Sequence, residues 1–202
     1  MPSDFITRKL AQTIFHAFDF AAYVGRPLNT YAVVILDADP KATDRIMQRI
    51  KNKCRRWLKR KQQKAGEQEN PPLHVYTFEC PDGAQVHVNW VLHLPAAFQD
   101  EFRQKMPDWV RKSQGRTPRD HDIIVQGVDP GTDKSLAKYI LKGTDPAYVP
   151  HFFLEDYAEP QGPIYGRRAG ASMALNKAAR NAAGFVPKRH IGRWKEKRIS
   201  RA

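Results

Sequence analysis

Apolar and polar positions alternate most regularly between residues 85 and 94. One side of this segment carries Val86, Val88, Trp90 and Leu92, and the other carries Gln85, His87, Asn89, Val91 and His93. A period of two residues predicts a β-strand with one apolar face. On its second face, polar side chains of metal-ligating types interrupt what would otherwise be a buried surface, so this face is a candidate functional site.

A second apolar run ends at Glu79, and the segment 81–84 between the runs reads Pro-Asp-Gly-Ala, which predicts a hairpin turn. If the last three residues of that segment form the loop, Glu79 lies directly opposite His87, with their Cβ atoms about 5 Å apart. Asn89 then lies on the same face. A carboxylate, an imidazole and an amide oxygen at one place predict a site for a divalent cation.

The rest of the chain predicts further helices and strands. Helices are expected over residues 4–23, from the turn at 37–40 to about 64, from Pro95 through Trp109, over 133–142 and over 175–183. Strands are expected over 29–36, 73–79, 85–94 and 121–128. The order strand, helix, strand, strand, helix, strand predicts an α+β fold, an antiparallel β-sheet with helices packed on one face, ferredoxin-like or RRM-like. Terminal extensions flank it, so we expect an N-terminal helix (1–25), a principal domain (26–145) and a C-terminal extension with a basic tail (146–202).

The charge of the chain indicates an anionic partner. Its 202 residues carry a formal net charge of +13. Between Lys41 and Lys64, eleven Lys and Arg residues accompany one acid, Asp44, and the segment 187–202 holds seven against Glu196. Such density is typical of nucleic-acid binding. A solvated helix face with a basic tail, as in ribosomal or membrane-surface proteins, is the alternative.

Cysteine content and hydropathy indicate the compartment. Only Cys54 and Cys80 occur, which excludes a disulfide framework and favours the reducing cytoplasm. Arg8, Lys9 and His16 interrupt the apolar stretches of the N-terminus, unlike a signal peptide. No apolar run reaches the ~18 residues of a membrane span. We expect a cytoplasmic protein without a membrane partner.

The predicted helix over 133–142 carries a second candidate motif. Its apolar anchors are Leu136 and Ile140, and Tyr139 and Lys142, three residues apart, share a different face. A phenol beside an ammonium suggests a nucleophile and a cation that steadies its phenolate or a phosphate. The alternative is a half-buried tyrosine with an exposed lysine near a helix C-terminus, where cations are favoured.

Taken together, Glu79, His87-Val-Asn89 and Tyr139-Ile-Leu-Lys142-Gly on a basic chain resemble the HUH endonucleases, and more narrowly their replication-initiator (Rep) branch. The resemblance covers roughly residues 28–145. Asn89 stands where the family motif has a second histidine, although some viral Rep proteins have glutamine there.

One more segment and one more histidine can be compared with the family. The apolar strand over 29–36 resembles the first motif of the family. His93 is a candidate substitute ligand, but it stands about 13 Å along the strand from Asn89, so we expect it to be structural.

The resemblance implies a nicking and joining endonuclease with the HUH palm fold. Mg²⁺ or Mn²⁺ would be held by Glu79, His87 and Asn89. Tyr139 would attack a phosphodiester and form a 5′-phosphotyrosine, with Lys142 beside it. This single-tyrosine chemistry initiates rolling-circle replication of a plasmid, phage or related mobile element. Tyr148 and Tyr157 lack a matching lysine and are expected to be structural.

The expected substrate is single-stranded or hairpin origin DNA. From charge alone, the expected DNA contacts are Arg26, Lys138, Arg167, Arg168, Lys188 and Arg189. No Gly-rich loop ending in Lys-Ser/Thr occurs, so a host helicase and polymerase would be needed. Two alternatives stay open: a non-catalytic single-stranded nucleic-acid-binding module in which Asn89 marks a lost metal site, and a relaxase or transposase of the same superfamily.

Overall fold

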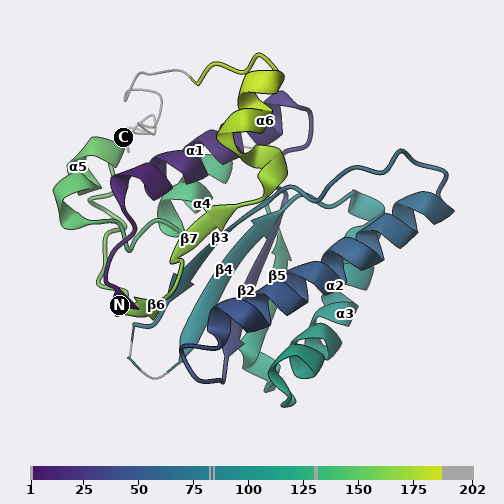
Figure 1. Cartoon of the computed structure of the whole chain (residues 1–202), viewed down its shortest axis with the longest axis horizontal. Coiled ribbons are helices and arrows are strands. Elements are labelled where there is room, and N and C mark those ends of the chain that lie inside the picture. The colour runs from purple at the N-terminus through teal and green to yellow at the C-terminus, as the bar shows by residue number, and fades with distance from the viewer. Residues whose placement is uncertain (1, 82, 84, 130–131, 188–202) are drawn as a thin grey trace, which may run out of the picture.

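A five-stranded antiparallel sheet in the order β5-β2-β4-β3-β7 organises the molecule (Figure 1). The computed structural model describes residues 2–81, 83, 85–129 and 132–187. The strands of the sheet are β2 (Thr30–Leu36), β3 (His74–Glu79), β4 (Val86–Leu92), β5 (Ile123–Gly127) and β7 (Ala169–Ala171). The predicted α+β class is therefore confirmed.

Four of these strands form a ferredoxin-like core with the helices α2 (Thr43–Lys64) and α3 (Ala96–Gln114). The chain runs β2-α2-β3-β4-α3-β5, and the β3–β4 hairpin inserts β4 between β2 and β3. The resulting order β5-β2-β4-β3 is the one that the split βαβ connection gives. This is the arrangement that the element order of the sequence predicts.

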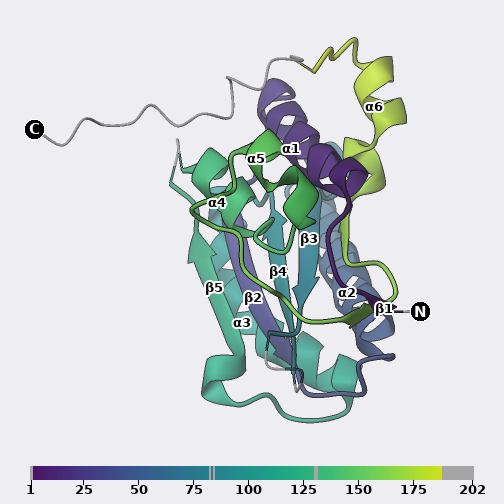
Figure 2. The same cartoon turned by 90° about the vertical axis from the view of Figure 1, so that its left-hand side faces the viewer.

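The expectation that helices cover only one face is wrong. α2 and α3 pack on one face, against Val88 and Trp90 of β4. On the other face, α1 (Arg8–Tyr23) and α4 (Asp133–Tyr139) pack against Val91 of β4 and its neighbours (Figure 2). The second layer forms because the helices outside the ferredoxin-like core also have apolar sides, which need a partner surface.

The C-terminal part completes the sheet. β7 pairs with the outer edge of β3, and β6 (Ile164–Tyr165) pairs with β1 (Pro2–Ser3) at the N-terminus. The shorter helical elements are η1 (Asp120–Asp122), η2 (Pro146–Tyr148), α5 (Val149–Phe152), η3 (Met173–Leu175) and α6 (Lys177–Ala182). Among the described residues, no helix is long and apolar enough to cross a bilayer.

Arg168 joins the N-terminal strand β1 to the segment just before β6 from inside the protein. It is only 1% exposed, and its guanidinium donates hydrogen bonds to the carbonyl oxygens of Ser3, Gln161 and Gly162, at 2.5, 2.8 and 2.6 Å. A buried guanidinium that satisfies three carbonyl groups is a structural cation. The expectation that Arg168 contacts DNA is therefore wrong.

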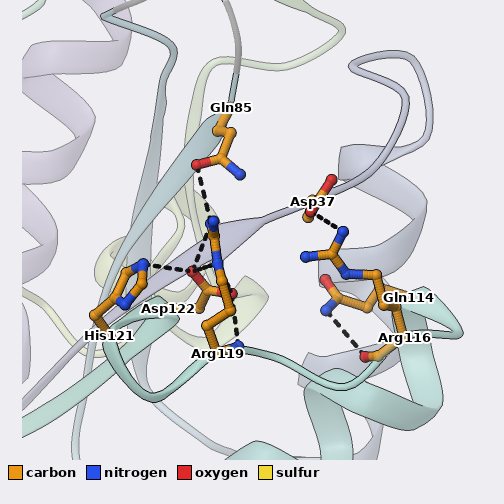
Figure 3. A network of polar contacts seen from close by, with 7 residues as sticks. All are labelled: Asp37, Gln85, Gln114, Arg116, Arg119, His121 and Asp122. Atoms are coloured by element: carbon orange, nitrogen blue, oxygen red, sulfur yellow. Dashed lines mark hydrogen bonds and ion pairs between the residues drawn. The ribbon is translucent and has the colours of Figure 1, made fainter.

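A polar network fixes the end of the sheet where the β3–β4 hairpin turns (Figure 3). The buried carboxylate of Asp122 accepts hydrogen bonds from the backbone N–H of Arg119 at 2.8 Å and from its guanidinium at 3.1 Å. Burial opposes the charge of Asp122, but these bonds hold its pKa below the usual value. Because Arg119 also donates to Gln85, the residue just before β4, the network ties the segment before β5 to this hairpin.

Candidate active site

The β3–β4 hairpin brings the predicted ligand positions onto one face of the sheet. Glu79 on β3 pairs directly with His87 on β4, which confirms the predicted register. Asn89 pairs with Thr77, two residues further along, so its side chain lies on the same face. This is the face covered by α1 and α4. Glu79 and Asn89 are buried there, and His87 is half-buried.

Glu79 is the centre of a buried polar network. Its Oε1 accepts a hydrogen bond of 2.6 Å from the amide of Asn89, and its Oε2 lies 3.3 Å from Nζ of Lys142. Burial raises the pKa of Glu79, while Lys142 and Asn89 lower it in part. Burial opposes the charge of Lys142, but the nearby carboxylate leaves its pKa above the usual value. The carboxylate and the ammonium therefore stabilise each other.

Tyr31 is a member of this network that the sequence did not single out. Its hydroxyl donates a hydrogen bond of 2.5 Å to Oδ1 of Asn89. Burial, with smaller contributions from Tyr139 and Glu79, raises the pKa of Tyr31, so the phenol stays protonated and acts as a donor. Asn89 is thus held from both ends, with its oxygen on Tyr31 and its nitrogen on Glu79.

Tyr139, the predicted nucleophile, lies at the open edge of the network. It is the last residue of α4, which ends three residues earlier than predicted, and Lys142 follows in the next turn. Nζ of Lys142 lies 4.8 Å from the centroid of the Tyr139 ring. The ring of Tyr31 meets that of Tyr139 nearly edge-on, at 6.5 Å between centroids. Tyr139 is 42% exposed, so solvent and ligands can reach it.

A groove opens beside Tyr139, between β5 and α4. Its volume is about 580 Å³. Val33 and Ile124 form apolar parts of its wall, Gln126 and Ser135 supply polar groups, and Tyr157 also borders it. Because Ile124 is 51% exposed, this part of the sheet face is open to solvent. The groove leads from the sheet edge toward Tyr139.

The remaining cations that were expected to contact DNA have different environments. Arg167 is exposed, and half-buried Arg26 donates a hydrogen bond of 3.0 Å to the carbonyl oxygen of Pro71. Lys138 is buried, 5% exposed, and its Nζ lies 5.7 Å from the ring centroid of Tyr157. The expectation that Lys138 contacts DNA is therefore wrong in this structure. Lys188 and Arg189 lie outside the described residues.

The residue types at the hairpin suit a divalent metal ion, but the Asn89 amide presents its nitrogen to Glu79 and its oxygen to Tyr31. Carboxylate and amide oxygens with one imidazole suit Mg²⁺ or Mn²⁺, and the Glu79 carboxylate is already paired with a cation, Lys142. In the part of the chain that the structure describes, no group of three or more His, Cys, Asp or Glu is placed to hold a metal. A set of three ligands there would need the Asn89 amide to turn its oxygen toward Glu79. His93 bonds instead through Nδ1 to the Pro27 carbonyl oxygen, at 2.7 Å.

No protein-family model and no curated protein matches this chain. A carboxylate, an imidazole and an amide lie on one sheet face, an ammonium lies beside the carboxylate, and an accessible phenol lies beside the ammonium. This arrangement brings ligand-type side chains, an ammonium and an accessible phenol close together.

Proposed function

We propose that this protein is a metal-dependent endonuclease that nicks and joins single-stranded DNA through a phosphotyrosine, as replication initiators of the HUH type do, and that it initiates rolling-circle replication. One observation carries the proposal. Lys142 lies between the two halves of the site, 3.3 Å from Oε2 of Glu79 and 4.8 Å from the ring centroid of Tyr139. Two motifs separated by about fifty residues of sequence thereby meet on one face of the sheet.

Tyr139 would carry the covalent step. Its phenol oxygen attacks the scissile phosphorus, the bond from phosphorus to the 3′ oxygen breaks, and a 5′-phosphotyrosine forms. The phenol proton passes to solvent, and the departing 3′ oxygen takes up a proton from water. Since one phosphate ester replaces another, the reverse reaction can rejoin the strand.

The other side chains would prepare the phosphate. A Mg²⁺ or Mn²⁺ ion bound by Glu79, His87 and Asn89 would supply Lewis-acid polarisation of the phosphate when present. To bind the ion, the Asn89 amide would turn its oxygen from the Tyr31 hydroxyl toward Glu79. Lys142 would place a positive charge beside the attacking oxygen and the phosphate.

The groove beside Tyr139 suits an unpaired strand. Exposed Ile124 and the neighbouring Val33 offer apolar surface to bases, and Gln126 offers hydrogen-bonding groups. Recognition of single strands combines such base contacts with cations along the backbone. A single-stranded or hairpin nick site at an origin is therefore the proposed substrate, presented with the help of a host helicase and polymerase.

The test is covalent trapping. A pool of labelled single-stranded oligonucleotides with random internal sequence is incubated with the full-length protein and Mn²⁺, then denatured. We expect a labelled protein–DNA adduct that Tyr139→Phe does not form and that the matched control Tyr148→Phe retains. Sequencing the trapped DNA would identify the nick site. An adduct of equal yield on Tyr139→Phe, or none on the wild-type protein, would overturn the proposal.

A second candidate function follows because the Glu79 carboxylate already has protein partners. It accepts a hydrogen bond from the Asn89 amide and forms an ion pair with Lys142. Such a closed network is also what a non-catalytic single-strand-binding module with a lost metal site would have. That function predicts binding of the same oligonucleotide pool without any adduct, and with no dependence on Mn²⁺.

A further inference from the structure

The seam between α2 and α3 carries a dense basic surface on the face of the sheet opposite Tyr139. These two helices bury their apolar sides against one face, whereas α4, which ends at Tyr139, packs on the other (Figure 2). Cations of both helices point outward from the seam, namely Arg49, Lys53, Arg55, Arg56, Arg60 and Lys112.

Two adjoining hollows run along this seam. Their volumes are about 380 and 260 Å³, and both are lined by Lys53, Arg56 and Lys112. Asp108 is the one carboxylate among their lining residues, and it is already paired with Arg111 and Lys112, each at 2.7 Å.

The cations of α2 at the seam lack such partners. Within the described ranges, no carboxylate lies at ion-pair distance from Lys53, Arg56 or Arg60. Uncompensated cations in a row raise the local concentration of a polyanion. The seam therefore presents uncompensated positive charge along its length.

The dimensions and chemistry of the seam favour a duplex over a single strand. Arg49 and Arg60 are eleven residues apart on one helix, or about 16 Å, which spans about five phosphates of one duplex strand. The aromatic side chains at the seam, Trp57 and Trp109, are only 3% and 8% exposed, so they offer no platform for unpaired bases. Contacts would be to the backbone alone, which fits duplex DNA bound without regard to sequence.

We propose that the α2–α3 seam binds the phosphate backbone of duplex DNA, as a site separate from the groove at Tyr139. The sheet lies between the two surfaces, so both can be occupied at once. This proposal does not depend on the proposed cutting function. If both hold, the seam anchors the protein on duplex DNA beside the strand that Tyr139 cuts.

The experiment measures binding of the full-length protein to a blunt random-sequence duplex of about 20 base pairs, two helical turns, over a series of salt concentrations. Removing two cations with Lys53→Gln/Arg56→Gln should weaken duplex binding roughly tenfold and reduce the slope of log K against log salt by about two. Lys9→Gln/Lys177→Gln, which removes two exposed cations on α1 and α6, should bind like the wild type. Arg60→Gln alone should reduce the slope by about one.

Each other outcome has a definite meaning. Unchanged duplex affinity and slope in both seam variants would overturn the proposal. A loss of affinity confined to single-stranded oligonucleotides would also overturn it, because the seam would then be a path for a single strand. A loss of affinity confined to anionic lipid vesicles would overturn it too, because the seam would then be a membrane contact. Formation of the Tyr139 adduct on single-stranded DNA by the seam variants keeps the two proposals separate, because that reaction tests only the groove.

Discussion

The hydroxyl of Tyr31 donates a hydrogen bond of 2.5 Å to the amide oxygen of Asn89, and both side chains are buried. The two residues come from neighbouring strands, β2 and β4. The bond fixes which end of the amide faces Glu79. That end is the nitrogen, so Tyr31 holds the Asn89 oxygen, the atom that would bind a metal ion, away from Glu79.

Tyr31→Phe tests this role. The change leaves the Asn89 oxygen buried without its donor, which should cost about 1–3 kcal/mol of unfolding free energy. We expect adduct formation to need several-fold less Mn²⁺ in the variant, with an unchanged rate at saturating Mn²⁺, because the amide oxygen no longer has to leave a donor to reach the metal ion. A titration of the rate of adduct formation against Mn²⁺ measures both the Mn²⁺ requirement and the rate at saturation. A variant with lower stability but an unchanged Mn²⁺ requirement would limit Tyr31 to a role in folding.

Lys142→Gln removes the cation between Glu79 and Tyr139. The carboxylate of Glu79 would keep its burial and lose its ion-pair partner at 3.3 Å. We expect adduct formation under single-turnover conditions to fall at least tenfold, and Lys142→Arg to recover part of it. Lys134→Gln, which removes an exposed lysine from α4, is the matched control. Equal rates in the two glutamine variants would show that Lys142 has no part in the chemistry.

Asn89→Asp tests the cation site with a side chain of the same shape. The amide nitrogen lies 2.6 Å from Oε1 of Glu79, so the change places two carboxylates in contact. One of them must take up a proton or share a cation. Without metal, we expect the variant to unfold at a lower temperature than the wild type. With Mn²⁺, its unfolding temperature should rise more than that of the wild type. Asn181→Asp, at an exposed position, should show neither effect, and a metal response no larger than that of this control would count against the site.

The hairpin could be predicted because two independent signals agree on it. The alternation in β4 sets which side chains share a face, and the loop length sets the register, which together place Glu79 opposite His87. Tyr31 could not be found in the same way. The segment 29–36 is apolar almost throughout, so its sequence does not distinguish its two faces, and only pairing with β4 places Tyr31 near Asn89.

Charge alone did not separate surface cations from buried ones. Arg168 and Lys138 were expected at the surface, but both are buried. Arg168 is needed where β1 and β6 meet, a pairing between segments more than 160 residues apart that no local pattern indicates. β7 was missed for a similar reason, since its three residues are small and show no period. The division of the candidate site between the hairpin and α4 could be predicted, because each half has its own motif.

Lys51 should give the protein a distinct dependence of stability on pH. It lies in α2, and its ammonium is 4.0 Å from the ring centroid of Tyr76. Burial, opposed by Asp44 and reinforced by Arg167, lowers the pKa of Lys51 from 10.5 to about 8. The unfolded chain therefore binds the proton more tightly than the folded protein does. Below pH 8 the charged lysine is present in both states and its burial destabilises the fold; this cost disappears as the pH rises toward 10.5.

Lys51→Met keeps an unbranched apolar side chain over the Tyr76 ring and removes the charge. We expect the variant to exceed the wild type in unfolding free energy at pH 7, by an amount on the order of 3 kcal/mol, since each pKa unit corresponds to about 1.4 kcal/mol. The difference should shrink steadily between pH 8 and 10.5. Urea unfolding of both proteins across this range measures it, and taking the difference cancels the titration of groups common to both. A difference that stays constant with pH would mean that Lys51 keeps its proton in the fold as readily as in the unfolded chain.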